Sequence, residues 1–148
     1  MAFNTEVHSS KKFRLGTRVK DKQGNEFIYL QGVASCVAGS WVSFDEAHVT
    51  TLLAANAKGR VAVAQAAVDA TTEYGWFQIY GKATGKVLAS FADNGLIFST
   101  ATAGSVDDAA VAGDLIVGAI GRSAIDTPST GMAYAELNYP FATDNLGS

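Results

Sequence analysis

The segment EYGWFQIYGKATGKV, residues 73–87, decides which fold the sequence predicts. Its first half alternates large side chains with the two-residue period of an extended strand. Trp76 and Gln78 fall on one face of that strand, and Phe77 and Ile79 fall on the other. Three of these four side chains favour burial, so the segment predicts a strand inside a packed β-structure.

The second half of the segment resembles a phosphate-binding loop only at Gly85-Lys86. That loop follows the pattern Gly-x-x-x-x-Gly-Lys-Ser/Thr, in which backbone amides surround the phosphates and the hydroxyl reaches a magnesium ion. Tyr80 stands where the first glycine belongs, and Val87 stands where the hydroxyl belongs. We therefore interpret the segment as a β-hairpin whose return strand runs over residues 87–91, and not as a nucleotide site.

Outward from this segment, short apolar runs alternate with turn signals. Fifteen glycines and only two prolines separate runs such as residues 26–31 and 115–120, and at least seven strands are expected. Residues 43–58 combine a capping-box pattern with β-branched residues and a turn signal, so a short helix or an irregular excursion is expected there. The predicted fold class is all-β: a compact sandwich or small barrel with an extended N-terminal arm and at most one short helix.

The composition indicates one globular domain that meets other chains. Of the 148 residues, 48% are hydrophobic and only 17% are charged, and the mean hydropathy is +0.13. Large apolar patches are rare on monomers, so a subunit of an assembly is expected. The apolar run 115–121 is too short to span a bilayer, and the N-terminus has no apolar signal core, so we expect a soluble protein made in a cytoplasm and no membrane partner.

Charge divides the chain unevenly. Residues 1–22 carry six basic side chains against Glu6 and Asp21, a net charge of +4, whereas the remaining chain has five basic and twelve acidic residues, a net charge of −7. We therefore divide the chain into a basic N-terminal arm (1–22), a β-rich domain (23–141) and a polar C-terminal tail (142–148). The candidate partner-binding residues are Lys11, Lys12, Arg14, Arg18 and Lys20.

The partner of such an arm is expected to be acidic, either a protein surface or nucleic acid. An arm of 22 residues can reach an adjacent subunit, because an extended chain spans up to about 3.3 Å per residue. The alternative interpretation is a solvated first strand with ordinary surface lysines, because six basic charges are few.

No residue cluster predicts a metal site, a cofactor site or a catalytic site. Asp45, Glu46 and His48 offer metal-binding groups, but a site needs further ligands and His8, in the arm, is the only other histidine. A polar turn is the simpler interpretation. Cys36 is a lone thiol in an apolar run and is expected to be a small buried residue.

Acid–base and nucleophilic chemistry have no better candidates. Asp107 and Asp108 are neighbours on an extended chain, so their side chains point to opposite sides and are expected to be solvated. No nucleophile elbow accompanies either histidine, and enzyme is the weakest class of function. Trp41, Trp76 and Tyr80 could stack on sugars in a carbohydrate or receptor-binding module, although large rings in strands favour the core.

The order of segments resembles that of small β-rich decoration, or cement, proteins of tailed-phage capsids. The motifs that carry the resemblance are Tyr74-Gly75-Trp76 with Gly81, the Ala-Gly-Asp tract at 112–114, and Gly121-Arg122. The resemblance covers residues 24–123, through the segments 26–44, 59–87 and 111–123.

This resemblance implies a structural role without catalysis. A decoration protein sits on the outer surface of the virion, spans neighbouring major capsid proteins and resists the pressure of packed DNA, so its partner is the major capsid protein and not nucleic acid. We also expect self-association, with a homotrimer first and a dimer second, because closed rings bury apolar surface on every copy. A tail or head-fibre component, a tail-tube or connector subunit, and the carbohydrate or receptor-binding module remain as alternatives.

Overall fold

The structure is a computed structural model that describes residues 6–111 and 114–143, and this part of the chain contains eleven strands and no helix. The all-β prediction is confirmed, while the finer expectation of a sandwich or small barrel stays a prediction. All pairings between strands are antiparallel. The strands are β1 (Val7–His8), β2 (Arg18–Lys20), β3 (Glu26–Gln31), β4 (Trp41–Phe44), β5 (Thr50–Leu52), β6 (Gly59–Ala64), β7 (Tyr74–Lys86), β8 (Leu96–Ser99), β9 (Val106–Asp107), β10 (Leu115–Gly121) and β11 (Met132–Ala142).

The predicted hairpin at residues 73–91 is wrong, because β7 is one continuous strand of thirteen residues. Gly81 adopts φ +95° and changes the direction of the strand without reversing it. Before Gly81 the strand pairs with β3, with Tyr29 opposite Trp76, and from Tyr80 onward it pairs with β11. One continuous strand therefore pairs with β3 along its first half and with β11 along its second half.

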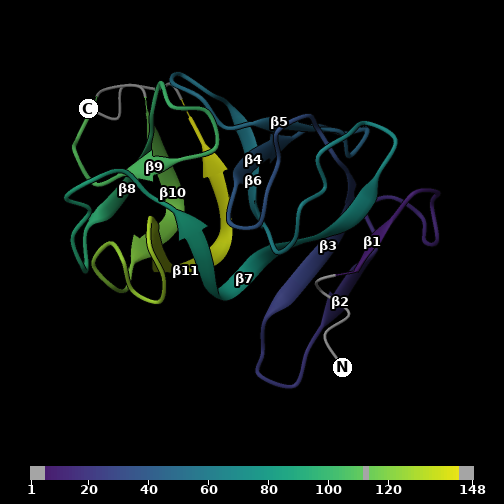
Figure 1. Cartoon of the computed structure of the whole chain (residues 1–148), viewed down its shortest axis with the longest axis horizontal. Helices are drawn as coiled ribbons and strands as arrows, with labels where there is room; N and C mark the ends of the chain where they lie inside the picture. Colours follow the sequence, from purple (N-terminus) through teal and green to yellow (C-terminus); the bar gives the residue numbers. More distant parts are fainter. Residues whose placement is uncertain (1–5, 112–113, 144–148) are drawn as a thin grey trace.

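A single sheet in the order β2-β3-β7-β6-β11-β10-β8-β9 links all these strands, with β1, β4 and β5 attached at its side. The strand β6 lies between two hydrophobic cores. Val61 and Val63 pack into one core with Trp41, whereas Ala62 and Ala64 pack into the other. The first core includes side chains of β8, β10 and β11, and the second includes side chains of β3 and of the first half of β7. Both cores also contain side chains of β4 and β6, which lie between the two ends of the molecule in Figure 1.

The segment expected to form a basic arm lies against the body from Glu6 onward. β1 pairs with β7 and β2 pairs with β3. Between them, Phe13 contacts Tyr29 and Trp76, with its ring centroid 5.3 Å from each of theirs. Tyr29 and Trp76 belong to a third apolar cluster on the outer face of β3 and β7, and Phe13 packs against it. Residues 1–5 of the expected arm, and 144–148 of the expected tail, lie outside the described residues.

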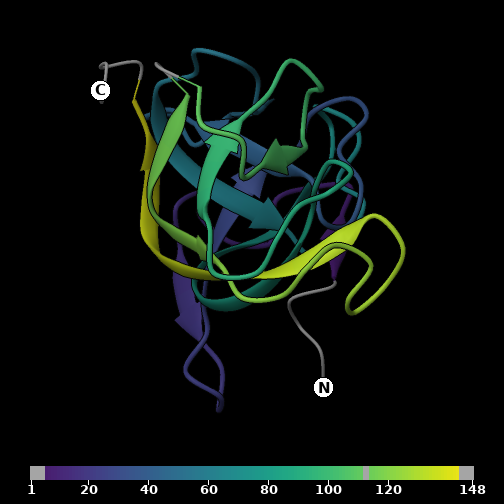
Figure 2. The same ribbon diagram turned by 90° about the vertical axis from the view of Figure 1, so that its left-hand side faces the viewer.

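The β2–β3 hairpin projects from the rest of the sheet (Figure 2). Its turn depends on Asp21, whose carboxylate accepts hydrogen bonds from Gln23 N (3.0 Å), Asn25 N (2.9 Å) and Asn25 Nδ2 (3.0 Å). An aspartate that satisfies the backbone of the following residues is a common way to fix a turn. The carboxylate of Asp21 is therefore committed to the turn.

The short helix considered at residues 43–58 is absent from the described chain, which has an irregular excursion containing β5 there. The carboxylate of Asp45 accepts hydrogen bonds from Ala47 N (3.0 Å) and Val49 N (3.1 Å), and His48 adopts φ +63°. A side chain that bonds locally in this way competes with a helix for the same backbone groups. The irregular excursion is therefore the alternative that the structure shows for residues 43–58, and these hydrogen bonds agree with the polar turn expected at Asp45, Glu46 and His48.

Candidate functional site

Exposed rings gather along one face of the molecule. Among the described residues eight large apolar side chains are exposed, and four of them are neighbours: Tyr80, Val117, Tyr139 and Phe141. The rings of Tyr80 and Tyr139 lie 5.2 Å apart, and Val117 stands opposite Phe141 in the β10–β11 pair. We call these four side chains the aromatic strip.

Two arginines flank the aromatic strip. Arg18 from β2 places its guanidinium carbon 5.9 Å from the centroid of the Tyr139 ring, and Arg60 from β6 lies 5.8 Å from that of Phe141. Arg60 also donates a hydrogen bond to the carbonyl oxygen of Tyr139, at 3.4 Å. Guanidinium groups held over rings lose less conformational freedom when a partner binds. We call the strip with its two arginines the aromatic–arginine surface.

The backbone around Tyr139 directs its ring outward. Tyr139 has φ +50°, a conformation that is rare for a residue with a side chain and that requires support from its surroundings. The β10–β11 register shifts between Val117 and Ala119, so the residues before Phe141 form a bulge. Gly118 lies opposite this bulge, and a Cβ there would lie 2.8 Å from the carbonyl oxygen of Asn138. Bulges commonly redirect side chains at functional sites.

A buried carboxylate ties the surface to the hairpin. Glu26 is only 5% exposed, and its Oε1 accepts a hydrogen bond of 2.6 Å from the hydroxyl of Tyr139. The guanidinium of Arg18 lies 3.7 Å from the other carboxylate oxygen. The hydrogen bond to Glu26 raises the pKa of Tyr139 above its usual value, because it stabilises the protonated hydroxyl. Three strands, β2, β3 and β11, are thus joined by one polar network.

An open cleft of about 620 Å³ adjoins the surface. It is lined by side chains from residues 43–51, by residues 58–60 at the start of β6, and by Arg18 and Ile28. Arg18, Phe44 and Arg60 line this cleft and also a smaller cavity of about 110 Å³ beside Tyr139. The rim of the larger cleft carries acidic side chains, Asp45 and Glu46, and basic side chains, Lys58 and Arg60. The cleft therefore suits polar and aromatic groups of another molecule.

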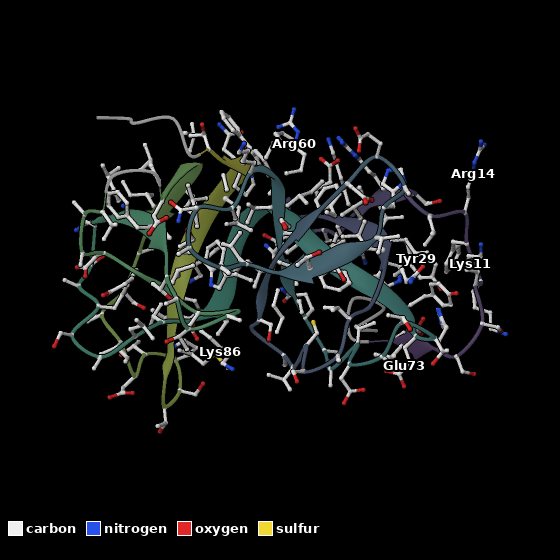
Figure 3. The ribbon with its side chains drawn as sticks, turned by 90° about the horizontal axis from the view of Figure 1, so that it is seen from above. Lys11, Arg14, Tyr29, Arg60, Glu73 and Lys86 are labelled. Atoms are coloured by element: carbon white, nitrogen blue, oxygen red, sulfur yellow. The ribbon has the colours of Figure 1, made fainter. Side chains whose placement is uncertain are left out.

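The structure separates the five sequence-predicted partner-binding residues into two groups. Arg18 belongs to the aromatic–arginine surface, and Lys20 follows on the same face of β2, because Val19 between them packs into the third apolar cluster. Lys11, Lys12 and Arg14 lie instead in the loop between β1 and β2, which Figure 3 shows at one end of the molecule, away from Arg60. The two groups can therefore contact different partners.

The loop at residues 11–14, which we call the basic loop, is held in place by Tyr29. The hydroxyl of Tyr29 accepts a hydrogen bond from Lys12 N (3.2 Å) and lies 2.8 Å from Nδ1 of His8. Burial raises the pKa of Tyr29. Thr17 donates to the carbonyl oxygen of Arg14 at 2.5 Å. The side chains of Lys11, Lys12 and Arg14 are exposed, so this loop presents its charges on a fixed backbone.

The other candidates from the sequence are less suited to binding. Trp41 and Trp76 are 0% and 3% exposed, so neither ring can stack on a sugar, while Tyr80 is exposed. Cys36 is buried, as predicted. Within residues 6–111 and 114–143, no group of three or more His, Cys, Asp or Glu side chains could hold a metal ion, and no helix could cross a membrane.

Sequence reasoning missed Arg60, Tyr139 and Phe141. One signal could have found part of the set: Pro140 within an aromatic strand marks a bulge, since proline cannot donate to a sheet. The contact between Arg60 and the last strand joins residues 79 positions apart, which no local pattern reveals.

Comparison of the chain with protein-family models, with curated proteins and with solved structures finds no match. The chemistry of the surface is therefore the basis for inference. Its exposed groups are aromatic rings and guanidinium groups, which recognise other molecules without covalent chemistry.

Proposed function

We propose that this chain is a structural virion protein that binds the outer surface of a phage capsid and stabilises the lattice of major capsid proteins. The observation that carries the proposal is the aromatic–arginine surface. Tyrosine and arginine are the residue types most enriched at the centres of protein interfaces, where a few side chains supply most of the binding free energy. The surface is a binding face for another protein.

The rigidity of the face supports this role. Arg18 and Arg60 already lie over rings, and Tyr139 is fixed by its bulge and by Glu26. A face that is ordered before binding loses little entropy when it docks, which suits a protein that must hold a lattice through many copies.

The identity of the partner rests on the resemblance to capsid decoration proteins. That resemblance runs through the segments 26–44, 59–87 and 111–123, which include β3, β4, β6, β7 and β10. Tyr80 of β7 and Val117 of β10 lie within these segments, so the resembling part of the chain contributes to the proposed binding face. A tail or head-fibre component would use the same face on a different neighbour.

Co-sedimentation with capsids that lack the protein tests the proposal. Tyr139→Ala and Phe141→Ala should each weaken binding at least about tenfold, equivalent to about 1.4 kcal/mol. Val37→Ala is the matched control, because Val37 is 38% exposed, close to the 37% of Tyr139, and lies outside the surface. Capsid binding that all three variants retain at wild-type strength would contradict the proposal.

Mass spectrometry of purified virions separates the capsid role from the tail alternative. A decoration protein should be present at a copy number comparable with that of the major capsid protein. A few copies per particle would instead identify a tail or fibre component.

A further inference from the structure

The charges that the sequence segregates also lie at opposite ends of the folded molecule. Figure 1, in which the longest axis is horizontal, shows β1 and β2 at one end and β8, β9 and β10 at the other. The first end carries the basic loop and β2. The described residues from 90 onward contain a single basic residue and six acidic ones: Arg122 against Asp93, Asp107, Asp108, Asp114, Asp126 and Glu136.

At the basic end, several acidic groups are already engaged. Asp21 holds its turn, and Glu26 is buried against Arg18 and Tyr139. Glu6 lies 3.7 Å from His8, and Glu73 accepts a hydrogen bond from the backbone N of Asp69. The basic loop projects its own cations outward, and Figure 3 shows Lys11 and Arg14 at the extreme of the molecule. Phe13 lies between them and is 45% exposed.

The other end carries both acidic side chains and exposed apolar side chains. Asp108 accepts a hydrogen bond of 3.0 Å from Ala92 N and so lies beside the turn that carries Asp93. Leu96, at the end of this turn, is 57% exposed, and Val111 is 51% exposed. The one basic residue of this end, Arg122, lies 3.6 Å from Glu136. We call the surface formed by Asp93, Leu96, Asp107, Asp108 and Val111 the acidic end.

We propose that the basic loop of one copy binds the acidic end of a second copy, so that the chains associate head to tail. The charges of the two surfaces are complementary, and each surface offers exposed apolar area: Phe13 on one side, Leu96 and Val111 on the other. A charged rim around an apolar centre is typical of protein interfaces.

This inference goes beyond capsid binding and does not depend on it. Neither the basic loop nor the acidic end contains a residue of the aromatic–arginine surface, and Arg60 lies between the two ends in Figure 3, so the proposed contact uses different residues from the proposed capsid-binding face. Two different patches form a heterologous contact, which closes into a ring when the rotation between copies permits and otherwise continues as a filament. The trimer expected from the sequence is a ring of this type, whereas a two-fold dimer would use one patch twice.

Charge reversal at either end tests the contact. Lys11→Glu/Arg14→Glu reverses the basic end and lowers the formal net charge of the chain from −3 to −7. Asp93→Lys/Asp107→Lys reverses the acidic end. Lys82→Glu/Lys86→Glu, in β7 between the ends, also gives −7 and is the matched control for net charge. Circular dichroism and denaturant unfolding establish that each variant is folded.

Light scattering then reports the mean mass of each protein at about 0.02 M and about 0.5 M salt. The wild type and the control should exceed the 15.4 kDa of a single chain at low salt and return toward it at high salt. Each reversed variant alone should stay near 15.4 kDa at both salt concentrations. An equimolar mixture of the two reversed variants should associate again, because one then presents two acidic ends and the other two basic ends.

Two results would overturn the inference. One is a wild type that stays monomeric at low salt up to high protein concentration. The other is association that the reversed variants retain to the same extent as the wild type. Co-sedimentation of the same variants with capsids is measured as a separate assay. A failure of head-to-tail contact is therefore distinguishable from a failure of capsid binding.

Discussion

Among single residues, Tyr139 combines a strained backbone, an exposed ring and a hydrogen bond to a buried carboxylate. Burial of Glu26 is costly unless its oxygens are paired, and Tyr139 and Arg18 supply the partners. The strain at φ +50° is therefore offset by a satisfied Glu26 and by the position that it gives the ring. The same side chain therefore contributes to stability and to the proposed binding face.

Tyr139→Phe separates these two roles. The substitution keeps the ring but removes the donor to the buried Glu26, so we expect the denaturant midpoint of unfolding to fall below that of the wild type. Tyr80→Phe is the control, since it makes the same chemical change on the neighbouring ring of the strip. Denaturant unfolding measures both. An equal effect of the two substitutions would mean that the Glu26 hydrogen bond contributes nothing to stability.

Cys36 gives a prediction in the alkaline range. Burial raises the pKa of its thiol from 9.0 to about 11, so the folded protein binds this proton more tightly than the unfolded chain. The stabilisation that the thiol contributes is fully present below pH 9 and is lost as the pH rises toward about 11. The free energy of unfolding of the wild type should therefore fall through this interval by about 2 kcal/mol more than that of Cys36→Ala.

The measurement compares urea unfolding of the two proteins at several pH values. Burial raises the pKa of Tyr29 and the hydrogen bond to Glu26 raises that of Tyr139, and both groups are present in both proteins, so the difference between wild type and variant is the quantity to examine. A difference that does not change with pH would contradict the raised pKa of Cys36.

Among the elements, β7 shows what a local pattern can and cannot predict. The alternation of its side chains assigned both faces correctly, because Trp76 packs in the outer cluster and Phe77 and Ile79 pack in the core shared with β3. Whether Gly81 would reverse the chain or bend it could not be predicted, since β3 and β11 decide it through pairings between distant residues. The local sequence of β7 does not indicate which distant strands it will pair with.

The candidate site also contains residues that the sequence predicted and residues that only the strand pairing brings together. Arg18 was predicted from its charge alone, and the burial of the two tryptophans was favoured over their exposure. Arg60 and Phe141 meet only because β6 pairs with the last strand after the bulge at Tyr139. The register of a bulged pair depends on non-local packing, so a surface built across it cannot be read from the sequence.

The bend in β7 can be tested with two glycines that share a positive φ. Gly24→Ala places a methyl group at φ +88° where nothing lies within 4 Å, whereas Gly81→Ala, at φ +95°, directs it into Asn25. Both substitutions should cost about 1 kcal/mol of backbone strain, and Gly81→Ala should cost about 1–3 kcal/mol more from the overlap. Thermal unfolding of both variants gives the difference, and equal midpoints would mean that Asn25 moves aside freely.

The whole molecule is organised by two cores that share β4 and β6 and by an N-terminal segment that closes a third cluster. One strand, β6, contributes to both cores: Val61 and Val63 lie on one of its faces, and Ala62 and Ala64 lie on the other. The N-terminal segment carries the basic loop and also contributes to packing, because the ring of Phe13 lies within this loop and covers Trp76. Loss of that ring should therefore affect the fold and the charged end together.

Phe13→Ala tests this coupling, with Arg14→Ala as the control that removes a neighbouring charge and leaves the ring contacts. Removal of the half-exposed ring should lower the free energy of unfolding by about 1–2 kcal/mol, less than for a fully buried phenylalanine. It should also shift tryptophan emission to longer wavelength, because Trp76, now 3% exposed, meets water while Trp41 stays in its core. Emission and stability that match those of Arg14→Ala would show that residues 6–20 lie on the body without stabilising it.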